Sequence, residues 1–388
     1  MAGKASGIFG GGGVPIGAIV QGQFAADASY LLCDGSTYTS ASYPLLDKTK
    51  LISYGTSAWA LKTLPATAVW NKVIYGNGTF LAFVSGSTAA ATSTDGGNTW
   101  TARTLANLAC TDGIYANGLF VLVGSGGTIQ TSPDGITWTA RTSGTTYLLN
   151  GIDYGNGIFV ISMGQAEQSS SQIATSTDGV TWTLRNVSGT PFLGSPVSFL
   201  NGKFYLPPYS HSASNAPSFI YISPDGINWT SKNLYQVFSW TTGAVGNYWQ
   251  GPILLFKGLY IIGYSSNVTY VGMDDSMRVD QRYLAGIQYT ALNVANGAMF
   301  ASPNGSNAAY LWYTLDYKNW QTITMPSATS WANGRKTVAY GNGVYVCINS
   351  ASSNQCAVMT PDTTKFVVPM VYGPDITTDH DRYYIKAA

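Results

Sequence analysis

The sequence predicts an all-β protein whose central part is a seven-bladed β-propeller with four-stranded blades. A unit of about 40 residues recurs along the chain, which is the spacing of propeller blades. Each unit carries two short turn phrases at corresponding places. The composition agrees, because 44 glycines, 13% aromatic residues and only 10% charged residues favour short strands and tight turns over disordered tails.

The first phrase is an aromatic residue or Val, one further residue, and then Asn-Gly. Asn-Gly between apolar runs is the strongest short signal of a β-hairpin, because both residues tolerate positive φ. A shortened copy, Phe256–Gly258, brings the number of units to seven, although six or eight blades stay open because residues 236–290 are degenerate. The full copies are Tyr75–Gly78, Tyr115–Gly118, Tyr154–Gly157, Phe199–Gly202, Val294–Gly297 and Tyr340–Gly343.

The second phrase is Ser-x-Asp-Gly-x-Thr/Asn-Trp, as in Ser132–Trp138. It resembles the Asp box of sialidase-like propellers. We expect its Ser and Asp side chains to bind backbone N–H groups of the turn, and its Trp to open the next strand. One copy per unit at a hairpin is a scaffold pattern, so we interpret these carboxylates as structural. They are Asp95, Asp134, Asp178, Asp225, Asp316 and Asp362.

The start of the repeat region indicates how the ring closes. Trp59–Leu64 matches Trp100–Leu105, the last strand of the first complete unit. We therefore expect Trp59–Leu64 to complete the last blade, beside a strand near Ala357–Thr360. Such a closure leaves no open sheet edge.

The order of strands A to D within a blade places the two turn phrases on one face. The B–C and D–A loops then lie on the opposite face, which we call the variable face. Its loops are predicted at Met163–Gln172, Pro207–Ser218, Ser231–Gly251 and Tyr264–Gln281.

Aromatic side chains are frequent in these loops, and aromatic rings stack on sugars and anchor protein interfaces. The variable face is therefore the predicted receptor-binding surface. The alternative is that some of these rings only fill gaps between blades. The candidate receptor-binding residues are Tyr209, His211, Tyr235, Trp240, Tyr248, Trp249 and Tyr270.

The two ends of the chain carry a further set of motifs. Val14–Val20, Tyr30–Ser36 with its Cys-Asp-Gly, and Tyr43–Leu46 resemble the start of the phage tail collar domain. Phe366–Pro369 and Tyr383–Ala387 are similar to later elements of that family. The resemblance implies a split collar-type domain formed by residues 14–50 and 367–388. The propeller, residues 51–366, would be inserted into it, and residues 1–13 would be a flexible N-terminal arm.

The same resemblance implies a function. A phage tail fibre or baseplate-tip protein would be made in the host bacterial cytoplasm, join the virion and act outside the cell. Its arm and collar would contact other tail or baseplate proteins, and a homotrimer is one arrangement found in such fibres. The propeller would bind a bacterial surface glycan or protein. The alternatives are a purely structural virion decoration or adaptor, and a glycan-degrading hydrolase of sialidase-like fold.

We do not expect an enzyme, a cofactor or a metal site. Sialidases need an arginine triad, a Tyr/Glu pair and an Arg-Ile-Pro motif, but this chain has no Arg-Ile-Pro and its single glutamate is Glu167. Asp274, Asp275 and Asp280 are interpreted as a solvated loop, with calcium or a carboxylate pair as the less favoured reading. Residues 379–381, Asp-His-Asp, are interpreted as polar surface rather than a metal site.

Charge and hydropathy exclude two further classes. The net charge is +1 with no cluster of Lys or Arg, so nucleic-acid binding is not expected. The sequence has no stretch of 18 apolar residues, so no membrane span is predicted. Residues 1–13 do not have the pattern of a secretory signal. Cys347 and Cys356 could face each other across one hairpin, but a reducing cytosol favours free thiols.

Overall fold

The computed structural model describes two compact units, Met1–Ala58 with Leu315–Asn319 and Thr360–Ala388, and Trp59–Thr314 with Trp320–Met359. Within the described residues the sole helical turn is the 3-10 turn η2, Ser125–Gly127, so the fold is all-β. The described residues are 19–22, 30–32, 37–39, 58–107, 109–164, 172–187, 195–207, 219–233, 253–256, 259–263, 268–272, 279–283, 289–303, 310–314, 320–327, 331, 336–349, 351–361, 365–367 and 382–386.

The smaller unit joins the two ends of the chain. Strand β33 (Arg382–Lys386) lies between β1 (Ile19–Gly22) and β2 (Tyr30–Leu32), and both pairings are antiparallel. A second pair joins β3 (Thr37–Thr39) to β32 (Lys365–Val367). Early and late segments of the chain therefore share hydrogen-bonded sheets, as a split domain requires. Its relation to the collar family stays a prediction.

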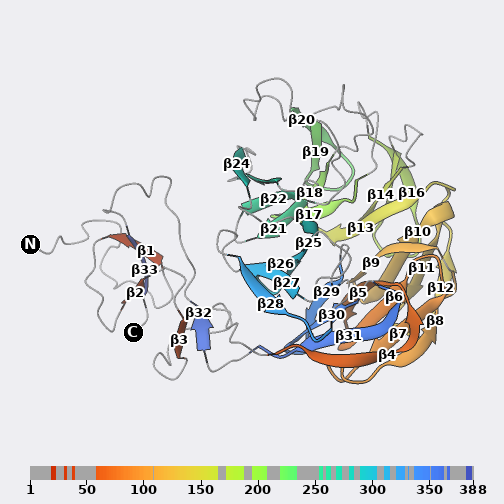
Figure 1. Ribbon diagram of the computed structural model, residues 1–388. Helices are drawn as coiled ribbons and strands as arrows, with labels where there is room; N and C mark the ends of the chain where they lie inside the picture. The colour runs from red at the N-terminus through yellow and green to blue at the C-terminus, as the bar shows by residue number, and fades with distance from the viewer. Residues whose placement is uncertain are drawn as a thin grey trace, which may run out of the picture. The chain divides into compact units, whose positions relative to one another are not determined.

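The larger unit consists of four-stranded antiparallel sheets, and seven are formed by the described residues (Figure 1). Six of them are meanders of four consecutive strands, in which each strand pairs antiparallel with the next. The first three contain β5 Trp70–Gly76, β6 Thr79–Val84, β7 Ala89–Ser93 and β8 Thr101–Thr104; β9 Cys110–Ala116, β10 Leu119–Gly124, β11 Ile129–Ser132 and β12 Thr139–Arg141; β13 Leu149–Gly155, β14 Ile158–Met163, β15 Gln172–Ser176 and β16 Thr183–Asn186.

The other four sheets follow the same order. The last of them takes its fourth strand, β4, from the start of the repeat region. They contain β17 Ser198–Leu200, β18 Lys203–Leu206, β19 Phe219–Ser223 and β20 Thr230–Asn233; β21 Ile253–Phe256, β22 Leu259–Gly263, β23 Val268–Gly272 and β24 Val279–Tyr283; β25 Tyr289–Ala295, β26 Ala298–Pro303, β27 Tyr310–Thr314 and β28 Gln321–Thr324; β29 Val338–Gly341, β30 Val344–Ile348, β31 Ser353–Met359 and β4 Ala60–Ala68.

The predicted closure is confirmed by the pairing of β4 with β31, in which Leu61 lies opposite Ala357 and Ala60 opposite Val358. Contacts between the first strands of the sheets also close a cycle. Each of β5, β9, β13, β17, β21 and β25 contacts the next, and β29 contacts both β25 and β5. The first strands therefore surround an axis, and the fourth strands form the outer rim.

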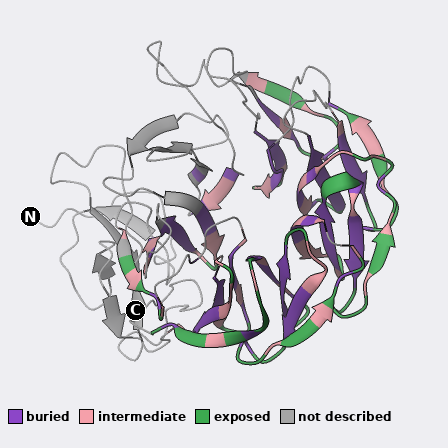
Figure 2. Cartoon of the chain, turned by 45° about the vertical axis from the view of Figure 1, so that its right-hand side comes forward, coloured by how far each residue is buried: buried purple, intermediate pink, exposed green. Residues whose placement is uncertain are grey.

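Burial follows the position of a strand in its sheet. Every residue of β6 and β14 is buried, whereas β8, β12 and β16 are largely exposed, so the core lies inward and the rim faces solvent (Figure 2). The second strands are covered on both faces by neighbouring sheets, which explains why they are continuous apolar runs rather than alternating ones. Burial of this apolar surface is the main stabilising term.

The six Asn-Gly turns have the predicted backbone. The Asn residues have φ between 43° and 49°, and the following Gly residues have φ between 73° and 82°. The glycine before the Asn has a separate reason. A Cβ atom added to Gly76 would lie 1.9 Å from Cγ of Tyr115, and one on Gly155 would lie 2.3 Å from the ring of Phe199. The aromatic residue of the next phrase therefore packs directly on Gly76 and on Gly155.

Two expectations from the sequence need correction. Tyr264–Gln281 is not one long loop, because it contains β23 and the start of β24, and these two strands pair with each other. Tyr270 accordingly lies in a strand, opposite Gln281. The predicted loop at Ser231–Gly251 also begins later than expected, since β20 extends to Asn233. Both errors arise where the Asp-box signal decays or is followed by polar residues.

Cys347 and Cys356 are free thiols in the described part of the chain. The register explains why the hairpin does not bring them together. Cys347 lies opposite Ala357, and Cys356 lies opposite Ile348, so the two cysteines occupy successive cross-strand positions. Successive positions point to opposite faces of a sheet. Burial raises the pKa of Cys356 to about 12, which keeps it a thiol.

Candidate functional site

The four described Asp-box turns share one hydrogen-bond pattern. In the turn of Asp134, the Ser132 hydroxyl donates to the carboxylate at 2.9 Å and accepts from the N–H of Gly135 at 2.8 Å. The same carboxylate oxygen accepts the N–H groups of Ile136 and Thr137 at 2.8 and 3.1 Å. Trp138 Nε1 donates to the Gly135 carbonyl at 3.2 Å. The carboxylate thus holds the backbone of its own turn.

These bonds stabilise the charged form of each carboxylate. The pKa of Asp178 is lowered to about 2, first by the N–H groups of Thr181 and Val180. The pKa of Asp95 also falls to about 2, because hydrogen bonds from Thr99, Ser93 and Asn98 outweigh a desolvation cost. Catalytic acids need a raised pKa, so this environment suits a fixed anion rather than a proton donor. Their scaffold role stays a prediction.

The Asn-Gly turns and the Asp-box turns adjoin each other, as the strand order predicts. Nδ2 of Asn156 donates to the carbonyl of Gly202, in the Asn-Gly turn of the next sheet, at 3.0 Å. It also donates to the carbonyl of Pro224, in the Asp-box turn of that sheet, at 2.7 Å. Asn117 makes the corresponding bond to the Thr177 carbonyl at 3.3 Å. Side chains of one turn therefore fix the neighbouring sheet on this face.

Most of the sequence-predicted receptor-binding residues lie outside the described residues, and Tyr270 is described only as part of β23. On the variable face, the structure therefore describes mainly the strands that flank the predicted loops. The candidates outside the described residues are Tyr209, His211, Tyr235, Trp240, Tyr248, Trp249 and, among the Asp-box residues, Asp316 and Asp362.

An axial cavity of about 260 Å³ lies among the first strands of the sheets. Its walls are mainly apolar. Four polar side chains line it: Asp153, Ser198, Asn293 and Lys336. The apolar lining residues are Ile152, Val197, Leu200, Ile253, Leu254, Leu255, Leu292, Val294 and Val338.

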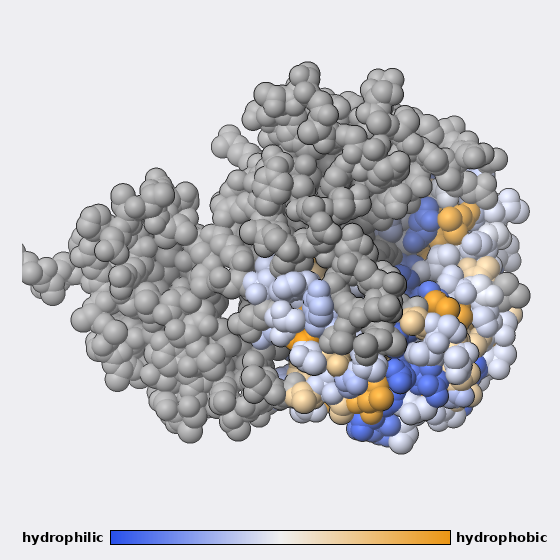
Figure 3. Space-filling view, viewed as in Figure 1, coloured by the Kyte–Doolittle hydropathy of each residue, from blue (hydrophilic) through white to orange (hydrophobic). Residues whose placement is uncertain are grey.

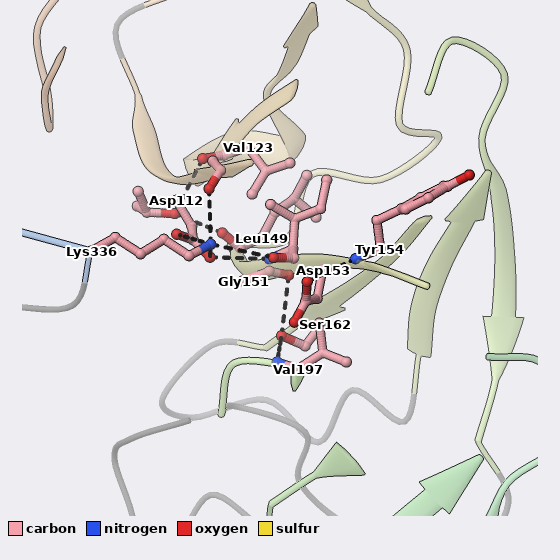
Figure 4. A network of polar contacts seen from close by, with 12 residues as sticks. Asp112, Val123, Leu149, Gly151, Asp153, Tyr154, Ser162, Val197 and Lys336 are labelled. Carbon is pink, nitrogen blue, oxygen red and sulfur yellow. Dashed lines mark hydrogen bonds and ion pairs between the residues drawn. The ribbon is translucent and has the colours of Figure 1, made fainter. Parts of the chain in front are cut away.

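Lys336 reaches two distant sheets across this region (Figure 4). Its Nζ lies 2.9 Å from Oδ1 of Asp112, which is completely buried, and donates to the Gly113 carbonyl at 2.8 Å and the Ile152 carbonyl at 3.4 Å. Oδ2 of Asp112 accepts the Ile152 N–H at 3.1 Å. Lys336 itself has φ 54°, an unusual value for a residue with a side chain. The ammonium group thus ties the segment that precedes β29 to β9 and β13.

Asp153 is a half-buried carboxylate on β13 that also bridges two sheets. One oxygen accepts the N–H of Phe199 on β17 at 2.7 Å, and the other accepts the N–H of Tyr154 at 2.9 Å. Burial raises the pKa of Asp153, while the positive charge of Lys336 and these hydrogen bonds oppose the rise and Asp112 adds to it. A titratable group in a cavity is a functional-site candidate.

Asn293 repeats this bridging role, since its Oδ1 accepts the N–H of Thr337 and its Nδ2 donates to the Thr337 hydroxyl, both at 3.1 Å. None of these axial residues was singled out from the sequence. A signal was present, because Asp153 occupies the place before Tyr where the two preceding units have Ile74 and Ile114. A carboxylate at an apolar repeat position is expensive to bury and marks a special environment.

Across the described residues, no helix is long and apolar enough to cross a membrane. In that same part of the chain, no group of three or more His, Cys, Asp or Glu side chains is arranged to hold a metal ion. Exposed apolar side chains stand apart from one another among polar ones on the face shown in Figure 3.

No protein-family model matches this sequence, and no curated protein matches it. Solved structures do. YCF48 bound to a D1 peptide is 14% identical, with a TM-score of 0.56 over 81% of this chain and 98% of that chain. Virginiamycin B lyase from Staphylococcus aureus is 10% identical, with a TM-score of 0.57 over 78% of this chain and 98% of that chain. The WD40 propeller domain of Doa1 is 12% identical, with a TM-score of 0.50 over 80% and 98%.

The chain has a β-propeller fold. At these identities the likeness concerns the fold alone, since the similar structures include a lyase, a protein bound to a peptide and a WD40 domain.

Proposed function

We propose that this protein is a non-enzymatic phage tail-fibre or baseplate-tip component whose propeller binds a bacterial surface receptor through its variable face. Each of the seven four-stranded sheets would be one blade, and the two ends of the chain would form a collar-type anchor. The single observation that carries the proposal is the terminal sheet, in which β33 pairs with both β1 and β2. Both ends of the chain contribute strands to this sheet, and the propeller segment lies between them in the sequence, which supports a split anchor.

Such an architecture is suited to display. An inserted domain that is attached at both ends is presented as a unit, and its loops can vary without disturbing the anchor. The side-chain bonds of Asn156 and Asn117 fix the turn face, whereas the loops of the opposite face differ from unit to unit in length and sequence. The low pKa of the Asp-box carboxylates also supports a role in scaffolding rather than in acid catalysis.

The test is adsorption of the purified full chain to cells of the host bacterium. Trp240→Ala and Trp249→Ala should weaken adsorption and leave the melting temperature unchanged, because rings that contact a receptor add nothing to the core. Ile136→Ala is the matched control, since Ile136 is an exposed apolar residue of an Asp-box turn and should not affect adsorption. Equal loss of stability and adsorption would assign those tryptophans to the core.

Two other outcomes would overturn the proposal. Wild-type protein that does not bind host cells, but is still required for virion assembly, would favour a structural decoration or adaptor. Release of reducing sugar from purified lipopolysaccharide or capsule would show a hydrolase instead. In that case the Asp-box aspartates would be poor candidates for its acid, given their lowered pKa.

A further inference from the structure

We propose that the axial cavity binds the primary ammonium group of a ligand, with Asp153 as its ion-pair partner and Ser198 as a second hydrogen-bonding group. The idea that a bacterial receptor supplies this ammonium group rests on the proposed function. The binding of an amine in the cavity does not, and it can be tested with the purified chain in the absence of cells.

Asp153 is fixed in position and retains acceptor capacity. Each of its oxygens takes one backbone N–H, from Phe199 at 2.7 Å and from Tyr154 at 2.9 Å. A carboxylate has about four lone-pair sites, so two acceptor positions remain. Because Asp153 lines the cavity, these positions can serve a ligand there.

Ser198 lies on β17, next to the residue whose N–H binds Asp153, and also lines the cavity. It is 5% exposed, and its hydroxyl forms no hydrogen bond with other residues of the described chain. This hydroxyl can therefore accept a hydrogen bond from a ligand group in the cavity. An ammonium group has three donors, which suits one carboxylate and one hydroxyl together.

The ammonium group of Lys336 is not the partner of Asp153 and Ser198 that we propose. Its ammonium group is already shared by Asp112 and by the carbonyls of Gly113 and Ile152. Among the charged residues that line the cavity or pair with one that does, the two carboxylates of Asp112 and Asp153 face one ammonium, so a second cation restores the balance. The amide of Asn293 is taken by Thr337.

The cavity also indicates the rest of the ligand. Leu255, Leu292, Val294 and Ile253 give it apolar walls, and about 260 Å³ accommodates a short carbon chain. The chemical class is therefore a primary amine on a small apolar skeleton. A carboxylate ligand would face the Asp153 charge and is disfavoured.

Binding should depend on pH in a defined direction. Burial raises the pKa of Asp153, so a proton competes with the ligand for this carboxylate at low pH. Affinity for an amine should therefore rise as pH increases through that pKa, until the amine itself loses its proton. The charged groups near Asp153 on the packed strands are Lys336 and Asp112, which pair with each other at 2.9 Å.

The probe is pentylamine, titrated into the full chain by calorimetry or followed by saturation-transfer NMR, with 1-pentanol and pentanoate as comparison ligands. We expect pentylamine to bind more tightly than either. Asp153→Asn should weaken pentylamine binding about ten-fold or more, because it removes a charge-assisted bond. Asn retains an oxygen for the Phe199 N–H, so the fold should persist. Ser198→Ala should weaken binding by a smaller factor, and Asp134→Asn, in an exposed Asp-box turn, should leave it unchanged.

Equal binding of pentylamine and pentanol, or pentylamine binding that Asp153→Asn and Ser198→Ala leave unchanged, would overturn the inference. So would an affinity that does not increase with pH. If Asp153→Asn does not fold, Ser198→Ala and the pH series decide alone. Loss of cell adsorption through Trp240→Ala with normal pentylamine binding would uphold both proposals as separate properties. Pentylamine binding without any cell adsorption would uphold the amine site and remove the receptor.

Discussion

The substitution Lys336→Met tests whether one side chain holds distant blades together. Met keeps most of the aliphatic stem but removes the ammonium group that lies 2.9 Å from the buried Asp112 carboxylate. The Lys336 side chain is 33% exposed, but the Asp112 side chain is fully buried, so removing the ammonium leaves a buried charge without compensation, which costs about 3–5 kcal/mol. For a unit of this size, about 1 kcal/mol corresponds to about 2 °C, so the melting temperature should fall by about 6–10 °C.

The assay is thermal unfolding followed by circular dichroism, with urea denaturation as a second measure. Lys62→Met, on the outer strand β4, is the control for loss of a lysine and should change little. The double variant Lys336→Met with Asp112→Asn should recover part of the loss, because Asn can still accept the Ile152 N–H and carries no charge. A fall below about 1 kcal/mol in the single variant, or a double variant less stable than the single one, would refute the reasoning.

Three further outcomes are expected. Gly76→Ala should destabilise the fold by about 1–3 kcal/mol in urea unfolding, because its Cβ would overlap the Tyr115 ring, whereas Ala116→Gly, at the matching position of the next unit, should cost about 1 kcal/mol at most. Asp134→Ala should lower the melting temperature, by about 0.5–2 kcal/mol in stability as for loss of a cap, and leave the affinity of the folded protein intact. Because the pKa of Asp178 is lowered to about 2 in the fold, its contribution is present above about pH 4 and lost as pH falls toward 2. The difference in melting temperature between wild type and Asp178→Asn should therefore shrink from pH 5 to pH 2.5.

Local chemistry made much of the fold predictable. The positive φ of Asn77 and its five counterparts, and the Ser–Asp bonds of the Asp boxes, depend on residues within one turn. The closure of the ring by β4 and β31, which we call the seam, was predictable for a different reason. Trp59–Leu64 repeats a strand whose place in the unit was already assigned. Here the repeat supplied the long-range information that a single copy could not.

The axial site was not predictable in the same way. Lys336 and Asp112 are 224 residues apart in sequence, and neither belongs to a repeated phrase. The prediction of a loop at residues 264–281 was wrong because no Asp-box phrase with Gly and Trp stands there, although β23 and β24 still form. Pairing of β23 with β22 and of β24 with β23 is kept where the turn signal has decayed, as context overrides local preference.

The seam between β4 and β31 has a mechanical consequence. The chain enters β4 beside Ala60 and leaves β31 after Val358, and these two residues are paired with each other. A pull transmitted through both connections therefore acts on the same end of both strands and in the same direction. Two covalent backbones share the load in parallel, and the hydrogen bonds between them are neither peeled nor sheared. A propeller held in this way should withstand tension better than one held by a single terminal strand.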